Sequence, residues 1–141
     1  MKHYKHKVVI DTNVFVAALL SKRGASYKLL FEISRDKFEQ NISTPLIFEY
    51  ESVAKRETKL TNEQIDAIID MICNISNKCK IFFLWRPYLK DIKDDMVLEL
   101  AIESQSEYII TYNKKDFKGI GKFGIQVLTP KEFLEKIGGL E

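Results

Sequence analysis

The chain has 141 residues, of which 45% are hydrophobic and 30% are charged, and its formal net charge is +2. These values are typical of a globular protein and exclude disordered and collagen-like chains, so we expect one domain over residues 1–141. The small net charge does not by itself indicate nucleic-acid binding, and any basic patch must come from local clustering of lysine and arginine.

The first part of the chain is predicted to contain two short strands and three helices. Residues 7–10 are β-branched and end at an acidic residue, which is typical of a buried parallel strand. The apolar residues 14–20 and the spacing of apolar residues in 26–38 predict two helices. Residues 41–43 form a brief second strand, and the Thr-Pro pair after it predicts a helix over residues 45–55.

Two helices and one strand are predicted in the middle of the chain. A helix is expected to begin at residue 61, because four isoleucines follow it at helical spacing. The apolar run of residues 80–85 predicts a third strand. The polar residues 90–95 open the next helix, and its inner face is expected to consist of Val97, Leu98, Ala101 and Ile102.

The last part of the chain completes an alternating pattern. Residues 108–111 predict a fourth buried strand, which a lysine-rich loop over residues 113–122 follows. A short fifth strand over residues 126–128 leads through Thr-Pro into a final helix over residues 131–137. Strands that alternate with helices through short turns predict an α/β sandwich with a parallel sheet.

Neither a membrane span nor a secretory signal is predicted. No apolar run approaches the roughly 20 residues that a membrane span needs, and Asp11 interrupts the apolar stretch after the basic N-terminus. Cys73 and Cys79 form no Cys-x-x-Cys motif and have no histidine nearby, which argues against a zinc site or a disulfide scaffold. We therefore expect a reduced, cytoplasmic protein.

Acidic and amide side chains follow four of the predicted strands. Asp11 ends the first strand, Glu49 lies one helical turn beyond the second, and three aspartates within residues 91–95 follow the third. Asn113 and Asp116 follow the fourth strand. Because functional groups in an open parallel sheet collect beyond the carboxyl ends of the strands, we expect these side chains to meet at one rim.

Acids gathered at one rim predict a metal site. Carboxylates repel one another unless a cation lies between them, and a hard divalent ion such as Mg²⁺ or Mn²⁺ suits oxygen ligands and also binds phosphate. Such an ion lowers the pKa of bound water and stabilises charge on a phosphate, so the predicted chemistry is phosphodiester hydrolysis. His3 and His6 lie in a predicted tail and are not placed to act instead.

Each acid also has a structural interpretation. Asp11 could cap the helix that follows it, and Asp94 and Asp95 could complement the dipole of a helix N-terminus. Glu49 and Glu51 lie about 200° apart on one helix, so only one of them can face the site, and Glu49 is the better candidate. The lysines of the 113–122 loop could contact phosphate or form a solvated surface.

Segments in order along the chain resemble PIN-domain proteins, especially the branch described as toxin components of toxin–antitoxin systems. Residues 8–21 open with Val-Val-Ile-Asp-Thr-Asn, and residues 42–50, 91–101 and 109–117 are similar to three further motifs of the family. Residues 127–134 resemble the end of the family's domain. One Asp-Thr-Asn alone would be weak evidence, whereas four ordered motifs at domain-wide spacing are specific.

The resemblance implies a three-layer α/β/α sandwich with a central, mainly parallel five-stranded sheet, and an Mg²⁺- or Mn²⁺-dependent endoribonuclease acting on single-stranded RNA. Asp11, Glu49 and Asp95 would hold the metal, directly or through water, and Asp94 and Asp116 would support them. Homo-oligomers, an inhibitory antitoxin partner and a cytoplasmic location are also implied. Residues expected to orient ligands or substrate phosphate are Thr12, Asn13, Ser21, Lys114 and Lys115.

Asn113 departs from the family pattern, in which many members have an aspartate. Asparagine offers an oxygen ligand without a charge, so Asn113 stays a candidate metal ligand and Asp116 could partly replace the missing acid. The departure leaves a second function open, a catalytically weak PIN fold that acts as an RNA- or protein-binding regulatory module. Aspartyl-phosphatase chemistry at Asp11 is disfavoured, because those enzymes usually have a second aspartate where this chain has Asn13.

Overall fold

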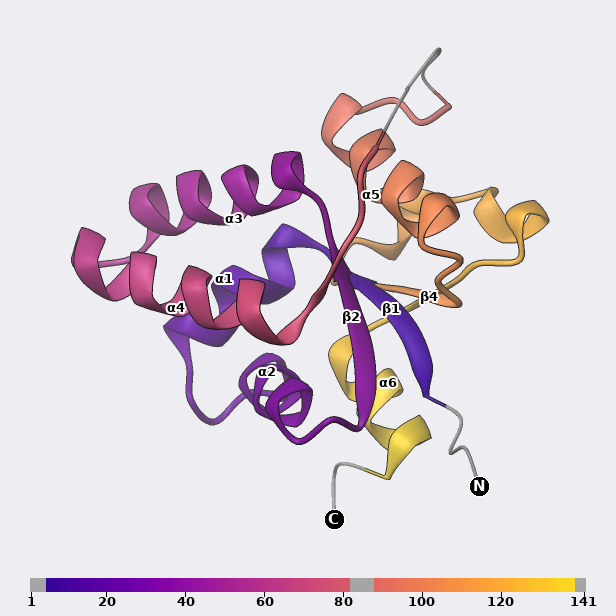
Figure 1. Cartoon of the computed structure of the whole chain (residues 1–141). Coiled ribbons are helices and arrows are strands. Elements are labelled where there is room, and N and C mark those ends of the chain that lie inside the picture. The colour runs from indigo at the N-terminus through magenta and orange to yellow at the C-terminus, as the bar shows by residue number, and fades with distance from the viewer. Residues whose placement is uncertain (1–4, 82–87, 139–141) are drawn as a thin grey trace.

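Five parallel strands form one sheet in the computed structural model, which describes residues 5–81 and 88–138 (Figure 1). The strand order is β3-β2-β1-β4-β5, and β1 (His6–Ile10) lies at its centre. β2 (Phe38–Ile42) and β4 (Tyr108–Ile110) flank β1, while β3 (Asn77–Lys78) and β5 (Gln126–Leu128) form the edges. The predicted parallel five-stranded sheet is confirmed.

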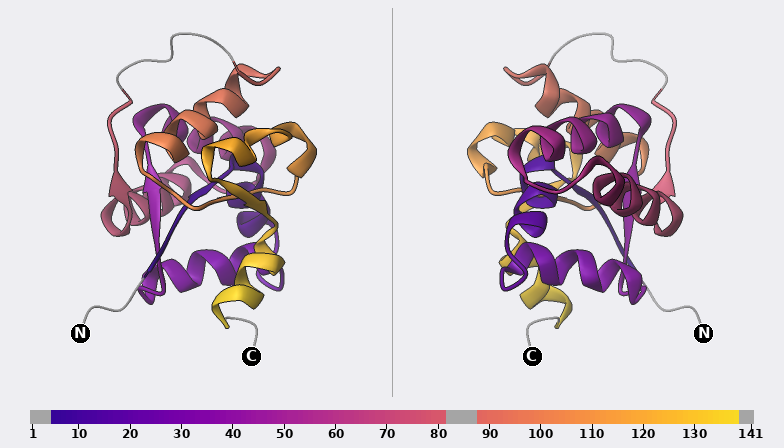
Figure 2. Two further views of the ribbon diagram at one scale, coloured as in Figure 1. Left: turned by 90° about the vertical axis from the view of Figure 1, so that its right-hand side faces the viewer. Right: turned by 90° about the vertical axis from the view of Figure 1, so that its left-hand side faces the viewer.

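Helices cover both faces of this sheet. Helix α5 (Ile92–Glu103) packs on one face against β1, β2 and β4, and Figure 2 shows it on the opposite side from α3 and α4. The other helices form a connected layer through α1, which contacts α2 and α3, with α4 against α3 and α6 against α2. Their bounds are α1 (Thr12–Leu20), α2 (Ala25–Ser34), α3 (Thr44–Glu57), α4 (Asn62–Ile75) and α6 (Pro130–Ile137). The expected three-layer α/β/α sandwich is confirmed.

Side-chain caps set the starts of several helices. Thr61 and Thr129 form capping boxes at the starts of α4 and α6, as the Thr-x-x-Gln and Thr-x-x-Glu patterns allow. Ser43 caps α3, and its hydroxyl accepts a hydrogen bond from the N–H of Leu46 at 3.3 Å. Each cap contributes about 1 kcal/mol to stability. The caps of α3 and α6 place these helix starts at the carboxyl ends of β2 and β5, the strands that precede them.

The second strand and the helix before it differ from the prediction. Helix α2 ends at Ser34, because Asp36 adopts a left-handed conformation with φ 62° that turns the chain. Phe38 was predicted to be helical, but it begins β2 and packs its ring edge-on against Phe133, with 5.1 Å between ring centroids. Burial of this aromatic pair in the core outweighs the helical pattern of the sequence.

The predictions for the third strand and for the inner face of α5 are also partly wrong. The strand lies at Asn77–Lys78, where the Asn77 amide donates to Oδ1 of Asn41 at 2.7 Å, and not at residues 80–85. Residues 80 and 81 are irregular, and residues 82–85 lie outside the described part of the chain. On α5, Leu100 is buried and Ile102 is exposed, because α5 packs on the sheet, on α3 and on the turns after β4.

Figure 1 shows β1 leading directly into α1 and β2 into α3, so both helices begin at the carboxyl ends of their strands. Two 3₁₀ turns, η1 (Lys114–Phe117) and η2 (Ile120–Phe123), follow β4 in the predicted lysine-rich loop. None of the helices in the described residues is long and apolar enough to span a membrane. The rim formed by these junctions is where the candidate site lies.

Candidate active site

Asp11 lies at the junction between β1 and α1 and is almost completely buried. Its backbone N–H donates to the carbonyl of Ile110 at 2.9 Å, which ties it to the end of β4. Its carboxylate accepts hydrogen bonds from the Thr12 N–H and the Thr111 hydroxyl, both at 2.8 Å, and from the Asn13 amide at 3.3 Å. Asp11 therefore caps α1 and is also held in one orientation by three donors, so the two interpretations of this residue are compatible.

Thr111 is a site residue that the sequence analysis did not single out. Its hydroxyl donates to Asp11 and accepts from the Asn13 amide at 3.2 Å and from the Asn113 N–H at 3.0 Å. Asn13 in turn accepts the Tyr112 N–H at 3.2 Å through its amide oxygen. Its position at the end of a buried strand, directly before a polar loop, is the feature of the sequence that could have identified it as a site residue. This network joins the loop after β4 to Asp11.

Burial is the largest cause that raises the pKa of Asp11. The Thr111 and Thr12 hydrogen bonds oppose this effect, whereas the negative charges of Asp116 and Glu49 add to it. Asp11 therefore lies close enough to acids from two other segments to interact with them electrostatically.

Glu49 is brought toward Asp11 by its neighbour Tyr50. The buried Tyr50 ring stacks on Phe15 with 4.4 Å between centroids, and its hydroxyl donates to the carbonyl of Ile10. Burial and then the charge of Asp11 raise the pKa of Tyr50, so its hydroxyl stays protonated and anchors α3 to the end of β1. Glu49 is partly buried and forms an ion pair with Lys93 at 3.5 Å.

Glu49 and Glu51 of α3 have different surroundings, as their positions on the helix predict. Glu51 pairs with Lys55 at 2.9 Å on the surface of α3, and the hydrogen bond from Lys55 lowers its pKa. Of Glu49 and Glu51, only Glu49 contributes to the raised pKa of Asp11. Glu51 is therefore a suitable control residue for experiments on Glu49.

Asp94, on the first turn of α5, belongs to the same acidic group. Its pKa is raised to about 6, mainly by burial and then by the negative charges of Asp11 and Asp116, followed by those of Asp91 and Asp95. Asp94 also lines a cavity together with Asp116. The structure thus joins Asp94 to acids from the β1 and β4 junctions.

Asp95 has different surroundings and is only 1% exposed. One carboxylate oxygen accepts the N–H groups of Tyr88 at 3.1 Å and Leu89 at 2.6 Å, which fixes the segment before α5. Its other oxygen is buried and has no hydrogen-bond partner among the described residues. Asp95 is the residue predicted from sequence, ahead of Asp94, to hold the metal, and that order stays a prediction. In the structure Asp94 interacts with the charges of Asp11 and Asp116, whereas Asp95 holds the segment before α5.

The fourth junction contributes Asp116. Its charge raises the pKa values of both Asp11 and Asp94, although Asp116 itself lies on the exposed turn η1. Asn113 precedes this turn, and its side chain makes no capping hydrogen bond. Many family members have an acid where this chain has Asn113, and here Asp116, three residues later, places a negative charge near Asp11.

A cavity of about 520 Å³ opens beside Asp94 and Asp116. Lys115 lines it, but Lys114 points to Glu132 and forms an ion pair at 2.9 Å. Ser21 caps the far end of α1, roughly 15 Å along the helix from Asp11, so it is not brought into this group. The complete lining is Tyr88, Leu89, Lys90, Asp91, Asp94, Lys115, Asp116 and Lys118.

The donor set suits a hydrated divalent ion. The charges that shift the pKa values of Asp11 and Asp94 are all carboxylates of the described chain, which is the repulsion that a cation relieves. Within residues 5–81 and 88–138, no three carboxylate, histidine or cysteine side chains are arranged to hold an ion directly. Mg²⁺ usually binds one or two carboxylates and keeps several waters, so these residues fit such an ion.

Comparisons with known proteins identify the family and agree with the fold. The family model described as a PIN domain matches residues 7–115. An uncharacterized protein of Methanocaldococcus jannaschii is 31% identical over 151 residues, which cover 96% of this chain and 94% of that protein. A chain in the crystal structure of VapBC2 from Rickettsia felis bound to a DNA fragment from their promoter shares the fold, with a TM-score of 0.61 and 16% identity over 87% of this chain and 98% of that one. The chain described here belongs to the PIN-domain family.

Proposed function

We propose that this protein is a metal-dependent endoribonuclease that hydrolyses phosphodiester bonds in single-stranded RNA. PIN domains are generally nucleases, and PIN nucleases generally use divalent metal ions. The observation that supports the proposal is the gathering of Asp11, Asp94 and Asp116, in which the acids raise the pKa values of Asp11 and Asp94. With Glu49 these three residues make four acidic groups, which favours an enzyme over a catalytically weak binding module.

Asp11 and Asp94 are the proposed ligands of Mg²⁺ or Mn²⁺, and Glu49 and Asp116 would act through water. When bound, the ion would activate water and neutralise charge on the scissile phosphate. Thr111 and Asn13 donate hydrogen bonds to the Asp11 carboxylate, which would orient this proposed ligand toward the ion. Lys115 and Lys118, at the edge of the cavity, would contact neighbouring phosphates of the RNA.

Removal of metal tests this function. The protein should cleave single-stranded RNA in Mn²⁺ or Mg²⁺, lose cleavage in excess EDTA, and regain it when Mn²⁺ is restored. The melting temperature should rise by roughly 5–10 °C at an ion concentration 100 times Kd, because the ion binds only the folded acidic group. Equal cleavage in EDTA would contradict metal dependence, and RNA binding without any cleavage would favour the regulatory module.

We further propose that a protein partner of the antitoxin type covers an apolar surface on α1, α2 and α4. The VapBC2 structure with the same fold is a complex bound to promoter DNA, and large exposed apolar patches commonly mark protein contacts. A cavity of about 230 Å³ lies in this surface. The exposed apolar side chains around it are Leu20, Tyr27, Phe31 and Met71.

Phe31→Glu should abolish the complex with this partner, because the exposed Phe31 ring lines the cavity. The measurement is light scattering of the chain co-expressed with the product of the adjacent gene. Phe48→Glu is the matched control, since Phe48 is exposed on α3 outside this surface. A chain that stays monomeric after co-expression would contradict the proposal, and a dimer of the chain alone would assign the surface to a second copy.

A further inference from the structure

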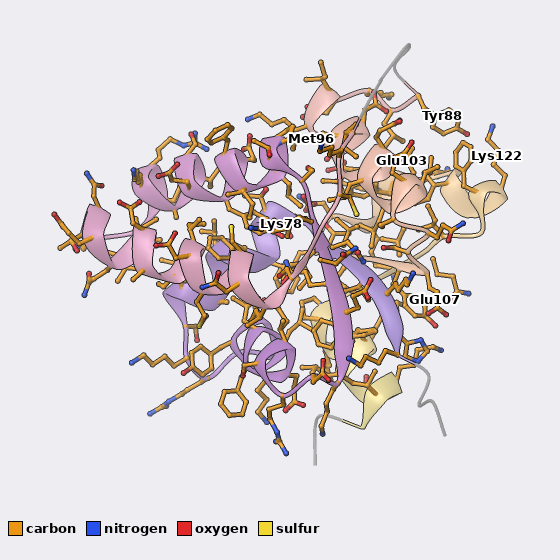
Figure 3. The ribbon with its side chains drawn as sticks, in the orientation of Figure 1. Lys78, Tyr88, Met96, Glu103, Glu107 and Lys122 are labelled. Carbon is orange, nitrogen blue, oxygen red and sulfur yellow. The ribbon has the colours of Figure 1, made fainter. Side chains whose placement is uncertain are left out.

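An aromatic pair lies at the edge of the acidic cavity and has no part in the hydrolysis proposed above. Tyr88, before α5, and Phe123, at the end of η2, are 43% and 42% exposed. Their ring centroids are 5.3 Å apart and their planes meet at 77°. The Lys122 ammonium lies 4.5 Å from the centroid of Tyr88 and 5.5 Å from that of Phe123, and Figure 3 shows Tyr88 and Lys122 side by side.

The Tyr88 ring has a defined position relative to the acids. The Tyr88 N–H donates to the buried Asp95, and the Tyr88 hydroxyl donates to the carbonyl of Gly119 at 3.4 Å. Gly119 has φ 92°, a conformation that glycine adopts without strain and that lets the loop turn toward Tyr88. Asp94 is the direct neighbour of Asp95 on α5, and both Tyr88 and Asp94 line the cavity. The first turn of α5 therefore carries Asp94 and, through Asp95, also fixes the position of Tyr88 beside it.

Loop anchoring alone does not account for this pair. Phe117 and Ile120 of the same loop are each 1% exposed and anchor it in the core. A pair of rings that served only packing would gain by burying the apolar area that Tyr88 and Phe123 leave in water. Two half-exposed rings with a lysine between them, at the edge of a cavity, present the surfaces that unpaired nucleobases and phosphates bind.

We infer that Tyr88 and Phe123 form a nucleobase-binding subsite in which an unpaired base of RNA, next to the phosphate in the acidic cavity, stacks on an exposed ring. This inference rests on the proposed function, because it assigns the substrate of the same site. Lys122 pairs with a phosphate of that nucleotide. Bases in a duplex are already stacked on their neighbours, so the subsite selects single-stranded segments, loops and ends.

Stacking can be measured without cleavage. In EDTA, the wild-type protein should quench the fluorescence of a single-stranded RNA that contains 2-aminopurine, because stacking on an aromatic ring quenches this base. Tyr88→Leu and Phe123→Leu should each weaken binding by about 5- to 100-fold and reduce the quenching. Tyr88→Phe should keep both, since it keeps the ring, and Tyr27→Leu is the control for loss of an exposed tyrosine on α2.

The outcomes separate this inference from the proposed function. Unchanged affinity and quenching in both leucine variants would overturn the subsite, as would equally tight binding of duplex RNA, even if the wild-type protein cleaves RNA in Mn²⁺. Ring-dependent quenching by a protein that does not cleave RNA would support the subsite and contradict the nuclease. Melting temperatures of the variants show whether each is folded, and Phe123→Leu leaves the hydrogen bonds of Tyr88 to Asp95 and Gly119 in place.

Discussion

Replacing Asp11 with asparagine should lower the rate of metal-dependent RNA cleavage at least a thousandfold, or about 4 kcal/mol in activation free energy, while the protein stays folded. Asp11 is the acid with the most hydrogen-bond donors directed at it in the site. Asparagine keeps the shape and one acceptor oxygen, so the hydrogen bond from the Thr111 hydroxyl can persist while the one from the Thr12 N–H is lost. The negative charge is lost, and with it the strongest proposed contact to the ion. Single-turnover cleavage in Mn²⁺, with circular dichroism as a check of folding, measures the effect.

Glu49 and Glu51 on α3 provide the matched comparison for this result. Glu49→Gln should slow cleavage by about ten- to a hundredfold, because Glu49 faces Asp11 but is also paired with Lys93. Glu51→Gln removes a carboxylate of the same helix that pairs only on the surface, and it should leave cleavage unchanged. If Asp11→Asn cleaves within tenfold of the wild type, Asp11 does not hold a catalytic ion and the proposed site is wrong.

Asp11 and Glu49 could be predicted from sequence because local rules set their positions. Asp11 directly ends a β-branched strand, and Glu49 lies at a fixed helical distance from the strand before it. Parallel strands bring such junctions to one edge, so order along the chain was enough to place both residues at the same rim. The parallel five-stranded sheet followed from the same alternation of strands and helices.

The distinction between Asp94 and Asp95 could not be made in this way. The two residues are adjacent on α5, and about 100° of helix rotation separates their side chains. Which of them faces the acids depends on the path of the chain before α5, since the N–H groups of Tyr88 and Leu89 are the partners of Asp95. Helical spacing alone does not show that path.

Contacts between distant segments account for the other differences. Thr111 gains its position only when β4 lies beside β1, and β3 is recognised by its pairing with β2 and not by an apolar pattern. The subsite of Tyr88 and Phe123 likewise joins residues 35 positions apart along the chain. None of these pairings follows from the residues of one segment.

Asp94→Asn and Asp95→Asn should change the stability of the metal-free protein in opposite directions. The pKa of Asp94 is raised from 3.8 to about 6, so the folded protein binds a proton more tightly than the unfolded chain does. Stability is therefore lost as the pH rises from about 4 through about 6, and it stays lower above that range. Asparagine removes this loss, and we expect a gain of about 1 kcal/mol at pH 7.5 and none at pH 4, after allowing for solvent screening of a half-buried group.

Asp95→Asn should instead lower the free energy of unfolding by about 2 kcal/mol at pH 7.5. The substitution weakens two hydrogen bonds from the N–H groups before α5 and places an amide where a buried oxygen has no hydrogen-bond partner among the described residues. Urea unfolding in EDTA at both pH values measures the two variants, and the same titration with Mn²⁺ should stabilise the wild type but not Asp94→Asn. Equal destabilisation by both variants at pH 7.5 would show that Asp94 is not under repulsion from its acidic neighbours. Changes of opposite sign in the free energy of unfolding would instead indicate that Asp94 serves metal binding and that Asp95 stabilises the fold.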